Sequence, residues 1–158
     1  MQDIEAQRQA VVAEARTWLR TPYHHMGRVK GAGVDCATLL AEVYARAGVV
    51  PTQVIPFYPP DWHLHRNAER YLDFILAQAS EIDDLPAPGD VAMWRFGKCF
   101  SHGAIVIDWP LVIHAYAGKG CVLEDTAKAV WLSRLAGKQR DNVRAVKFFT
   151  LKSWANRT

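Results

Sequence analysis

One cysteine in the sequence stands where nucleophilic chemistry is favoured. Cys36 follows a glycine-punctuated loop, 27–34, and occupies the first turn of a segment whose apolar residues recur at helical spacing. A helix N-terminus presents unpaired N–H groups and the positive end of the helix dipole, which favour thiolate over thiol. The same N–H groups could form an oxyanion hole. By position alone, a small buried cysteine packed under the helix is an equally good interpretation.

Two histidines favour the nucleophilic interpretation. A catalytic cysteine needs a base, and the base needs a partner that orients it. His102 begins one predicted strand and His114 lies in the next. A three-residue loop at 108–110 would place Ile107 opposite Leu111 and make the two histidines diagonal neighbours on one sheet face. One imidazole could then orient the other.

Two metal arrangements are possible alternatives. One is a four-ligand zinc site made of Cys99, His102, His114 and Cys121. The other is a cluster in the segment after the second helix, made of Asp61, His63 and His65. Zinc ligands usually come in close pairs, and only Cys99 and His102 have such spacing. We therefore expect no metal and no organic cofactor. Cys99 and Cys121 are expected to be inert strand residues, and His63 and His65 to lie in a surface loop.

The elements that must position these groups can be read from periodicity and turn residues. Asp35 is a good N-cap for the helix that carries Cys36, and Gly48 is a good stop. We expect helices at 3–19, 36–47 and 66–80, a short helix at 126–136, and strands at 90–96, 102–108, 111–116, 121–125 and 143–151. The tail at 152–157, with Trp154, is expected to be frayed. Helices first and an antiparallel meander later indicate an α+β domain.

Composition is typical of one ordinary globular domain, 1–158. The chain is half apolar, and its net charge of +3 is scattered, which does not favour direct nucleic-acid binding. The longest uncharged apolar run, 103–107, is far short of the about 20 residues that cross a bilayer. Three cysteines make a poor disulfide framework, so we expect at least one free thiol. The N-terminus lacks the pattern of a secretory signal; we expect synthesis in the cytoplasm.

Five motifs in order resemble the NlpC family of papain-like cell-wall peptidases. They lie at 21–23 (TPY), 33–40 (GVDCATLL), 88–91 (PGDV), 101–106 (SHGAIV) and 112–115 (VIHA). The resemblance implies a papain-like α+β fold with N-terminal helices packed on a central antiparallel sheet. It also implies cleavage of stem peptides in bacterial peptidoglycan, typically between D-glutamate and the diamino acid.

The resemblance also assigns roles by motif. Cys36 corresponds to the nucleophile, His102 to the base and His114 to the polar residue that orients it. Tyr23 corresponds to a tyrosine whose hydroxyl lies near the nucleophile and helps to hold the oxyanion; its alternative role is that of a half-buried aromatic filler. Asp35 is interpreted as the N-cap rather than a catalytic acid.

The sequence departs from the commonest family pattern in two places. Ala37 and Thr38 follow the cysteine where Ser-Gly is usual, and segment 58–66 is extra. This insert resembles the version found in bacteriophage tails and gene transfer agents, where the enzyme is part of the tail tip and opens the wall during nucleic-acid delivery. The partners implied are peptidoglycan and the tail-tip or baseplate hub proteins of a phage-like particle, with the enzyme acting at the periplasmic wall and no contact with a membrane.

Two rival functions remain at this point. A non-catalytic tail-tip adaptor would keep the papain-like fold and use the groove for docking alone. An enzyme with the same catalytic residues could instead catalyse amidase or acyl-transfer chemistry. Replacing Cys36 with Ala separates the enzyme, which would lose cleavage, from the adaptor, which would be unaffected.

Overall fold

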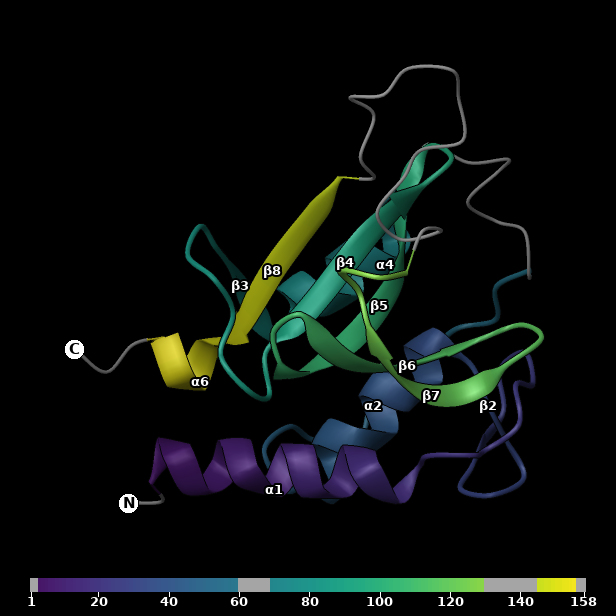
Figure 1. The fold of residues 1–158 in the computed structure, drawn as a ribbon, viewed down its shortest axis with the longest axis horizontal. Helices are drawn as coiled ribbons and strands as arrows, with labels where there is room; N and C mark the ends of the chain where they lie inside the picture. The colour runs from purple at the N-terminus through teal and green to yellow at the C-terminus, as the bar shows by residue number, and fades with distance from the viewer. Residues whose placement is uncertain (1–2, 60–68, 130–144, 156–158) are drawn as a thin grey trace.

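The computed structural model describes residues 3–59, 69–129 and 145–155 of the 158-residue chain. Within them, helices lie against an antiparallel sheet, so the expected α+β class is confirmed (Figure 1). The elements in chain order are α1 (Ile4–Thr17), β1 (Arg28–Val29), β2 (Gly33–Val34), α2 (Cys36–Arg46), α4 (Arg70–Leu76), β3 (Ala79–Ile82), β4 (Val91–Phe96), β5 (Cys99–Asp108), β6 (Leu111–Tyr116), β7 (Gly120–Asp125), β8 (Val146–Leu151) and α6 (Lys152–Ala155).

Six strands form one sheet in the order β3-β8-β4-β5-β6-β7. From β4 to β7 the strands follow one another as an antiparallel meander, as the sequence predicts. The last strand, β8, lies between β3 and β4, with Phe149 opposite Val91 and Leu151 opposite Ala79. The short strands β1 and β2 form a separate hairpin just before α2.

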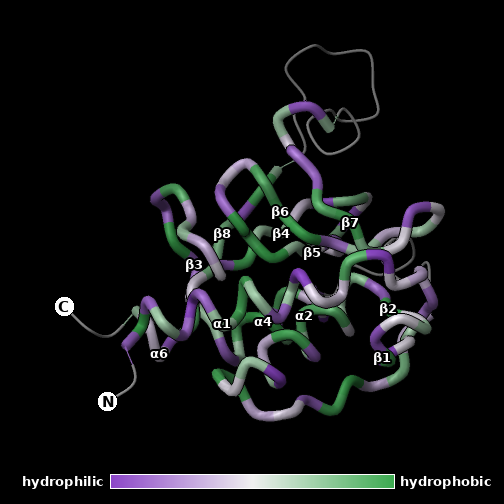
Figure 2. Tube along the Cα trace, turned by 60° about the horizontal axis from the view of Figure 1, so that its bottom comes forward, coloured by the Kyte–Doolittle hydropathy of each residue, from purple (hydrophilic) through white to green (hydrophobic). Residues whose placement is uncertain are grey.

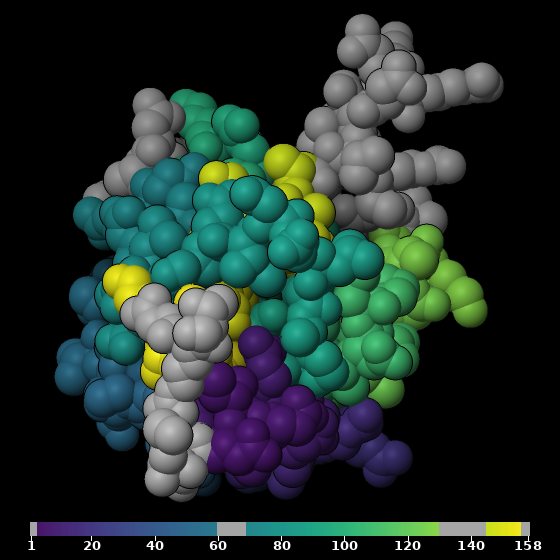
Figure 3. Space-filling view, turned by 90° about the vertical axis from the view of Figure 1, so that its left-hand side faces the viewer, coloured from purple at the N-terminus to yellow at the C-terminus, as the bar shows by residue number. Residues whose placement is uncertain are grey.

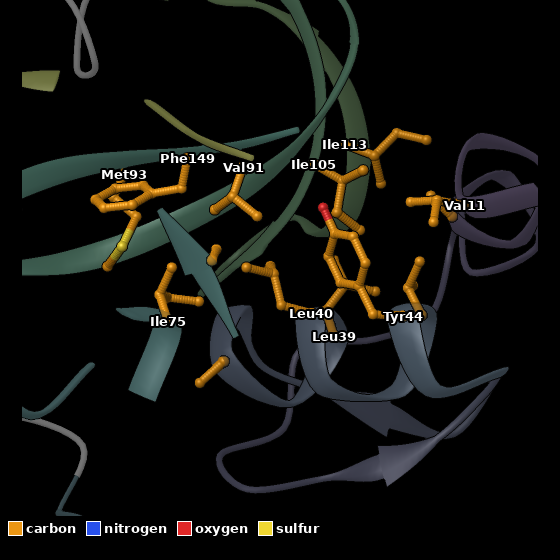
Figure 4. Close-up of a cluster of buried hydrophobic side chains, with 14 of the residues drawn as sticks. Val11, Leu39, Leu40, Tyr44, Ile75, Val91, Met93, Ile105, Ile113 and Phe149 are labelled. Atoms are coloured by element: carbon orange, nitrogen blue, oxygen red, sulfur yellow. The ribbon is translucent and has the colours of Figure 1, made fainter. Parts of the chain in front are cut away.

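The main core joins α2 to the sheet. Leu39, Leu40 and Tyr44 lie on the face of α2 that is turned toward the sheet (Figure 4), in one cluster with Ile105 and Ile113 of the central strands, and all five side chains are almost completely buried. Full burial of a side chain of this size stabilises a fold by about 1.5–3 kcal/mol. The helix that begins at Cys36 therefore cannot shift against the sheet without opening this core.

The other face of the sheet is also buried. A smaller cluster gathers there from β4, β5, β6 and the segment after β7, and consists of Ala92, Trp94, Ala104, Val106, Val112 and Ala129. Because successive strand side chains point to opposite faces, strands buried on both faces become apolar along their length. Figure 2 shows this as hydrophobic stretches on the central strands.

The C-terminal segment is anchored, in contrast to the frayed end expected from the sequence. Trp154 in α6 is only 6% exposed, and its indole N–H donates to Gln7 of α1 over 2.7 Å. The Arg8 guanidinium lies over the Trp154 ring and also bonds the buried Asp90 carboxylate at 2.8 Å. In the space-filling view of Figure 3, C-terminal residues are visible between α1 and the middle part of the chain. The expectation of fraying was wrong for 152–155 because it overlooked these long-range contacts.

Other differences concern element boundaries. The helix expected at 66–80 is shorter, since α4 ends at Leu76 and residues 79–82 pair with β8 as strand β3. Residues 126–128 form a turn rather than the start of a helix. The rest of that predicted helix, most of the insert at 58–66 with Asp61, His63 and His65, and positions 143–144 lie outside the described residues. No helix among the described residues is long and apolar enough to cross a membrane.

Candidate active site

The helix that carries Cys36 begins as the sequence predicts. The Asp35 side chain accepts hydrogen bonds from the backbone N–H groups of Ala37 and Thr38, and the Thr38 hydroxyl returns one to the Asp35 N–H. Such a reciprocal capping box satisfies donors that a helix start would leave unpaired. It also fixes the direction in which the first residue, Cys36, leaves the helix.

Two of the N–H groups expected to be free for an oxyanion are therefore occupied. The amides of Ala37 and Thr38 both point at Asp35 Oδ1, at 3.0 and 2.9 Å. The Cys36 amide lies next to its own sulfur and lowers the pKa of the thiol. Of the groups at this helix start, the Cys36 N–H is the one positioned to bind a negative charge that develops beside the sulfur.

The Cys36 sulfur lies against the backbone on both sides of His102. Its thiol donates to the Ser101 carbonyl over 3.8 Å, and the Gly103 N–H lowers the thiol pKa by hydrogen bonding. The Tyr71 hydroxyl donates to the Cys36 carbonyl at 3.0 Å. A Cβ at position 103 would stand 2.5 Å from the Tyr71 oxygen, so this close approach requires a glycine.

The electrostatics of Cys36 differ from the expectation of a readily formed thiolate. Burial raises the pKa of its thiol to about 12, with the Asp35 carboxylate adding to the rise and the nearby N–H groups opposing it. Desolvation and a neighbouring negative charge both disfavour an anion, and here they outweigh the helix start. The sulfur therefore needs a proton acceptor to become a nucleophile at neutral pH.

The two histidines meet as predicted. His102 Nε2 and His114 Nδ1 are 2.7 Å apart, and both side chains are buried. The expected register is confirmed in the body of the hairpin, where Ile105 lies opposite Ile113. The prediction that Ile107 faces Leu111 was wrong: Asp108 pairs with Leu111 across a register shift, and Trp109 and Pro110 form the turn.

A third polar residue, not identified from the sequence, extends this pair. Glu124 on β7 accepts a hydrogen bond from His114 Nε2 at 2.6 Å. His114 is fully buried and Glu124 is 18% exposed, so the carboxylate stands between the imidazole and solvent. Burial lowers the pKa of His114 while Glu124 acts to raise it. The only sequence signal was a carboxylate at the diagonal position of the next predicted strand.

Tyr23, the residue predicted to help hold the oxyanion, lies at the wall of the cavity that contains Cys36. It forms a bridge with Val34, just before α2, and lines the same cavity as Cys36. Burial and the nearby Cys36 and Asp35 raise the pKa of its hydroxyl to about 12. At neutral pH this group is therefore a neutral hydrogen-bond donor.

A cavity of about 950 Å³ connects these groups. Cys36, His102 and Tyr23 line it together with residues from α4, β5, the end of β6 and the segment before residue 59; the full lining is Tyr23, His25, Asp35, Cys36, Ala37, Ile55, Pro56, Phe57, Tyr58, Arg70, Tyr71, Asp73, Phe74, Phe96, Ser101, His102, Ala115, Tyr116 and Ala117. This space is of the size that binds small ligands and peptide segments.

The proline-rich segment that closes one side of the cavity is tied to Asp35. The Tyr58 hydroxyl donates to Asp35 Oδ2, which also accepts the Met26 N–H at 2.8 Å. His25 Nε2 donates to the Tyr58 carbonyl at 2.6 Å, and the two rings meet edge to face. The sequence analysis did not identify Tyr58 or His25 as site residues, because an irregular segment carries no periodicity that indicates which side chains turn inward.

Of the two alternative metal arrangements, only the zinc site of Cys99, His102, His114 and Cys121 lies among the described residues, and it is not assembled there. Among the described residues, no group of three or more His, Cys, Asp or Glu side chains is arranged to hold a metal ion. Cys99 and Cys121 form no disulfide among the described residues; both lie in strands, as predicted, and are buried in the core. Burial raises the pKa of both thiols, that of Cys121 to about 12.

Comparison with known proteins identifies the fold. No protein-family model and no curated protein matches the sequence. Among solved structures, the NlpC/p60 domain of the peptidoglycan hydrolase SagA matches with a TM-score of 0.57 and 19% identity, over 89% of this chain and 96% of that one. The NlpC1 protein from Trichomonas vaginalis gives 0.56 and 15%, over 92% of this chain and 45% of its own.

A Staphylococcus aureus protein described as similar to a lipoprotein of the NLP/P60 family gives a TM-score of 0.55 and 20% identity, over 92% of this chain and 42% of that one. The chain thus spans the SagA domain almost fully and less than half of the other two proteins. The expected papain-like α+β fold is confirmed: the chain has the fold of NlpC/p60 domains.

Proposed function

We propose that the protein is a cysteine endopeptidase that cleaves stem peptides of bacterial peptidoglycan. The observation that carries the proposal is that Cys36, at the capped start of α2, shares one cavity with His102, which is hydrogen-bonded to His114. These are the three groups that thiol peptidase chemistry requires: a nucleophile, a base and a residue that orients the base. The shared fold with a domain of a peptidoglycan hydrolase supports the substrate class.

The reaction begins with a proton transfer inside the cavity. The thiol turns from the Ser101 carbonyl to His102, which takes its proton, and the sulfur attacks the carbonyl carbon of the scissile amide. Because burial and Asp35 raise the thiol pKa, the sulfur becomes anionic only as His102 becomes cationic. The protonated His102 then gives its proton to the leaving amine, and water hydrolyses the thioester and regenerates the thiol.

The oxyanion of the tetrahedral intermediate needs donors beside the sulfur. The Cys36 N–H and the Tyr23 hydroxyl are the donors we assign to it, since the next two helix amides are bound to Asp35. The raised pKa of Tyr23 keeps its proton in place through the pH range in which the enzyme would work. Loss of one such donor typically costs about 10²- to 10³-fold in rate.

The test is to incubate the protein and its Cys36→Ala variant with purified peptidoglycan and to identify soluble products by mass spectrometry. New stem-peptide termini from the wild type alone would establish the peptidase, and the fragment masses would show whether the D-glutamate to diamino acid bond is cut. Cys121→Ala is the matched control, because it removes a buried thiol outside the cavity. Products with sugar-amide rather than peptide cleavage would identify an amidase instead.

The setting in which the enzyme acts is also part of the proposal. We assign it to the tail tip of a phage or gene-transfer-agent particle, where hub proteins would deliver it to the periplasmic wall. This rests on the resemblance of segment 58–66. Mass spectrometry of purified particles would show whether the chain is a constituent. Particles with Cys36→Ala should assemble and adsorb but lose delivery; full delivery by them would favour the structural adaptor.

A further inference from the structure

The polar row across the sheet extends one residue beyond the expected pair. His102, His114 and Glu124 lie on the adjacent strands β5, β6 and β7, and each is within hydrogen-bond distance of the next, at 2.7 and 2.6 Å. His114 pairs with Val122 in the register of β6 and β7, so Glu124 is its diagonal neighbour on the same face. The row runs from the cavity to the partly exposed outer edge of the sheet.

The hydrogen bonds of this row define where the protons are. A carboxylate has no proton to donate, so His114 Nε2 must carry the hydrogen that bonds Glu124. Burial lowers the pKa of His114 and favours its neutral form. A neutral imidazole has one N–H, so His114 Nδ1 is an acceptor and His102 Nε2 must be the donor.

The consequence concerns the other ring nitrogen of His102. With its proton on Nε2, neutral His102 carries no proton on Nδ1, the ring nitrogen nearer the backbone. The Cys36 sulfur lies against that same backbone, at the Ser101 carbonyl and the Gly103 N–H. The opposite tautomer of His114 would place the His102 proton on Nδ1, and His102 could not accept the thiol proton there.

We propose that Glu124 is a positioning residue that sets the tautomers of both histidines, so that His102 Nδ1 carries no proton and can accept the one from Cys36. When His102 becomes cationic, the negative charge of Glu124 also stabilises the cation through His114. The catalytic consequence rests on the proposed peptidase function, whereas the tautomers and the reactivity of the thiol do not.

Other charged and titratable groups adjoin the row and must be kept constant in any test. Among the described residues they include Cys36 of α2, Tyr116 of β6 and Lys119 in the turn before β7. Lys119 is fully exposed and acts to lower the pKa of His114, opposing Glu124. The aromatic rings of Trp94 and Phe96 on β4 also contact the His102 ring and carry no charge.

The test compares the wild type with Glu124→Gln and Glu124→Ala. The readout is the rate at which iodoacetamide alkylates Cys36 as a function of pH, followed by mass spectrometry, which needs no substrate. We expect Glu124→Ala to slow alkylation at pH 7 by about 10- to 100-fold, by analogy with the loss of the outer hydrogen-bond partner of a metal-binding histidine. Glu124→Gln keeps an acceptor but loses the negative charge that stabilises cationic His102, so the acid limb of the profile should move to lower pH.

A second readout is the tautomer itself. Long-range ¹H–¹⁵N spectra of Cys36→Ala should show the Nε2–H form for both neutral histidines, and adding Glu124→Ala should introduce the Nδ1–H form. Glu81→Gln is the matched control and should change neither readout. Glu81 pairs with Lys147 and lies on β3, at the edge of the sheet opposite to β7. If Glu124→Ala leaves the tautomers and the alkylation rates unchanged, the role of Glu124 is overturned, whether or not the wild type cleaves peptidoglycan. If both change but the wild type cleaves no peptidoglycan, the peptidase function is overturned instead.

Discussion

The two ends of the candidate active site are held in different ways. At the nucleophile end, Asp35 caps α2 and fixes Cys36 through residues that adjoin it in the chain. At the base end, His102, His114 and Glu124 come from three different strands. One end depends on local backbone geometry and the other on the register of a sheet. The charges differ too, because Asp35 opposes the thiolate whereas Glu124 stabilises the imidazolium.

The largest loss of activity should follow from replacing His102, the proposed base. His102→Ala removes the proton acceptor, so peptidoglycan cleavage should fall by about 10²- to 10⁴-fold, the usual contribution of general acid–base catalysis. Alkylation of Cys36 at pH 7 should fall as well, because the remaining thiol has a pKa near 12 and is protonated below it. The measurements are product release and thiol labelling on the same samples.

The control for that variant is His24→Ala, a histidine exposed on the loop before β1. It should leave both readouts unchanged. Equal alkylation of Cys36 in the wild type and in His102→Ala at pH 7 would show that the sulfur ionises without His102, contrary to the assigned roles.

Gly103→Ala tests a place where the two ends touch. The new methyl group would lie 2.5 Å from the Tyr71 hydroxyl and displace it from the Cys36 carbonyl. Overpacking of this kind costs about 1–3 kcal/mol in the free energy of unfolding, measured by urea denaturation. A double-mutant cycle with Tyr71→Phe sharpens the result: removal of the oxygen should make the pair less destabilised than the sum of the single variants. Simple additivity would contradict the contact.

Asp35→Asn isolates the charge at the nucleophile end. The amide oxygen can still cap α2, but the negative charge that raises the thiol pKa is gone. In a His102→Ala background, which reports the thiol alone, alkylation of Cys36 should therefore begin at lower pH. Glu42→Gln, on the same helix but outside the cavity, serves for comparison. Identical pH profiles for His102→Ala alone and for His102→Ala combined with Asp35→Asn or with Glu42→Gln would show that Asp35 does not affect the pKa of the Cys36 thiol.

The smallest expected effect concerns the segment tied to Asp35. Tyr58→Phe removes the hydroxyl bond to that carboxylate but leaves the hydrogen bond from the His25 imidazole to the backbone carbonyl of residue 58 intact. The loss should be about 1 kcal/mol in the free energy of unfolding, typical of one hydrogen bond. Thermal melts of both variants are the measurement. Phe57→Ala is the control: it alters a side chain that is 75% exposed and should leave stability unchanged. A larger loss in Phe57→Ala than in Tyr58→Phe would reverse this assignment.

The same contrast explains what the sequence could predict. The start of α2 was predictable because Asp35, Cys36 and Thr38 are neighbours, and their signals are local. The meeting of His102 with His114 was predictable because a short turn joins their strands and fixes the register. The paired strands β6 and β7 are also close in the chain, yet a carboxylate such as Glu124 is indistinguishable from an ordinary solvent-facing residue until the histidine beside it is known.

The features that the sequence analysis missed depend on distant contacts. Strand β3 forms because Ala79 and its neighbours pair with β8, about 70 residues further along the chain. Trp154 is buried because Gln7 and Arg8 receive it. Tyr58 turns inward because Asp35 accepts its hydroxyl. None of these partners is marked by periodicity or turn residues, so only the folded chain identifies them.

The interior position of β8 sets the order in which the protein can be completed on the ribosome. Until residues 146–151 have been made, residues Val91 to Trp94 of β4 lack the strand with which they later pair, β8, and this edge of the sheet stays open. Such an open edge is a template for pairing with other chains. The sheet that carries the histidine row is thus finished only after residues 146–151 have been made, and a nascent chain that lacks them would be exposed to aggregation before its fold is complete.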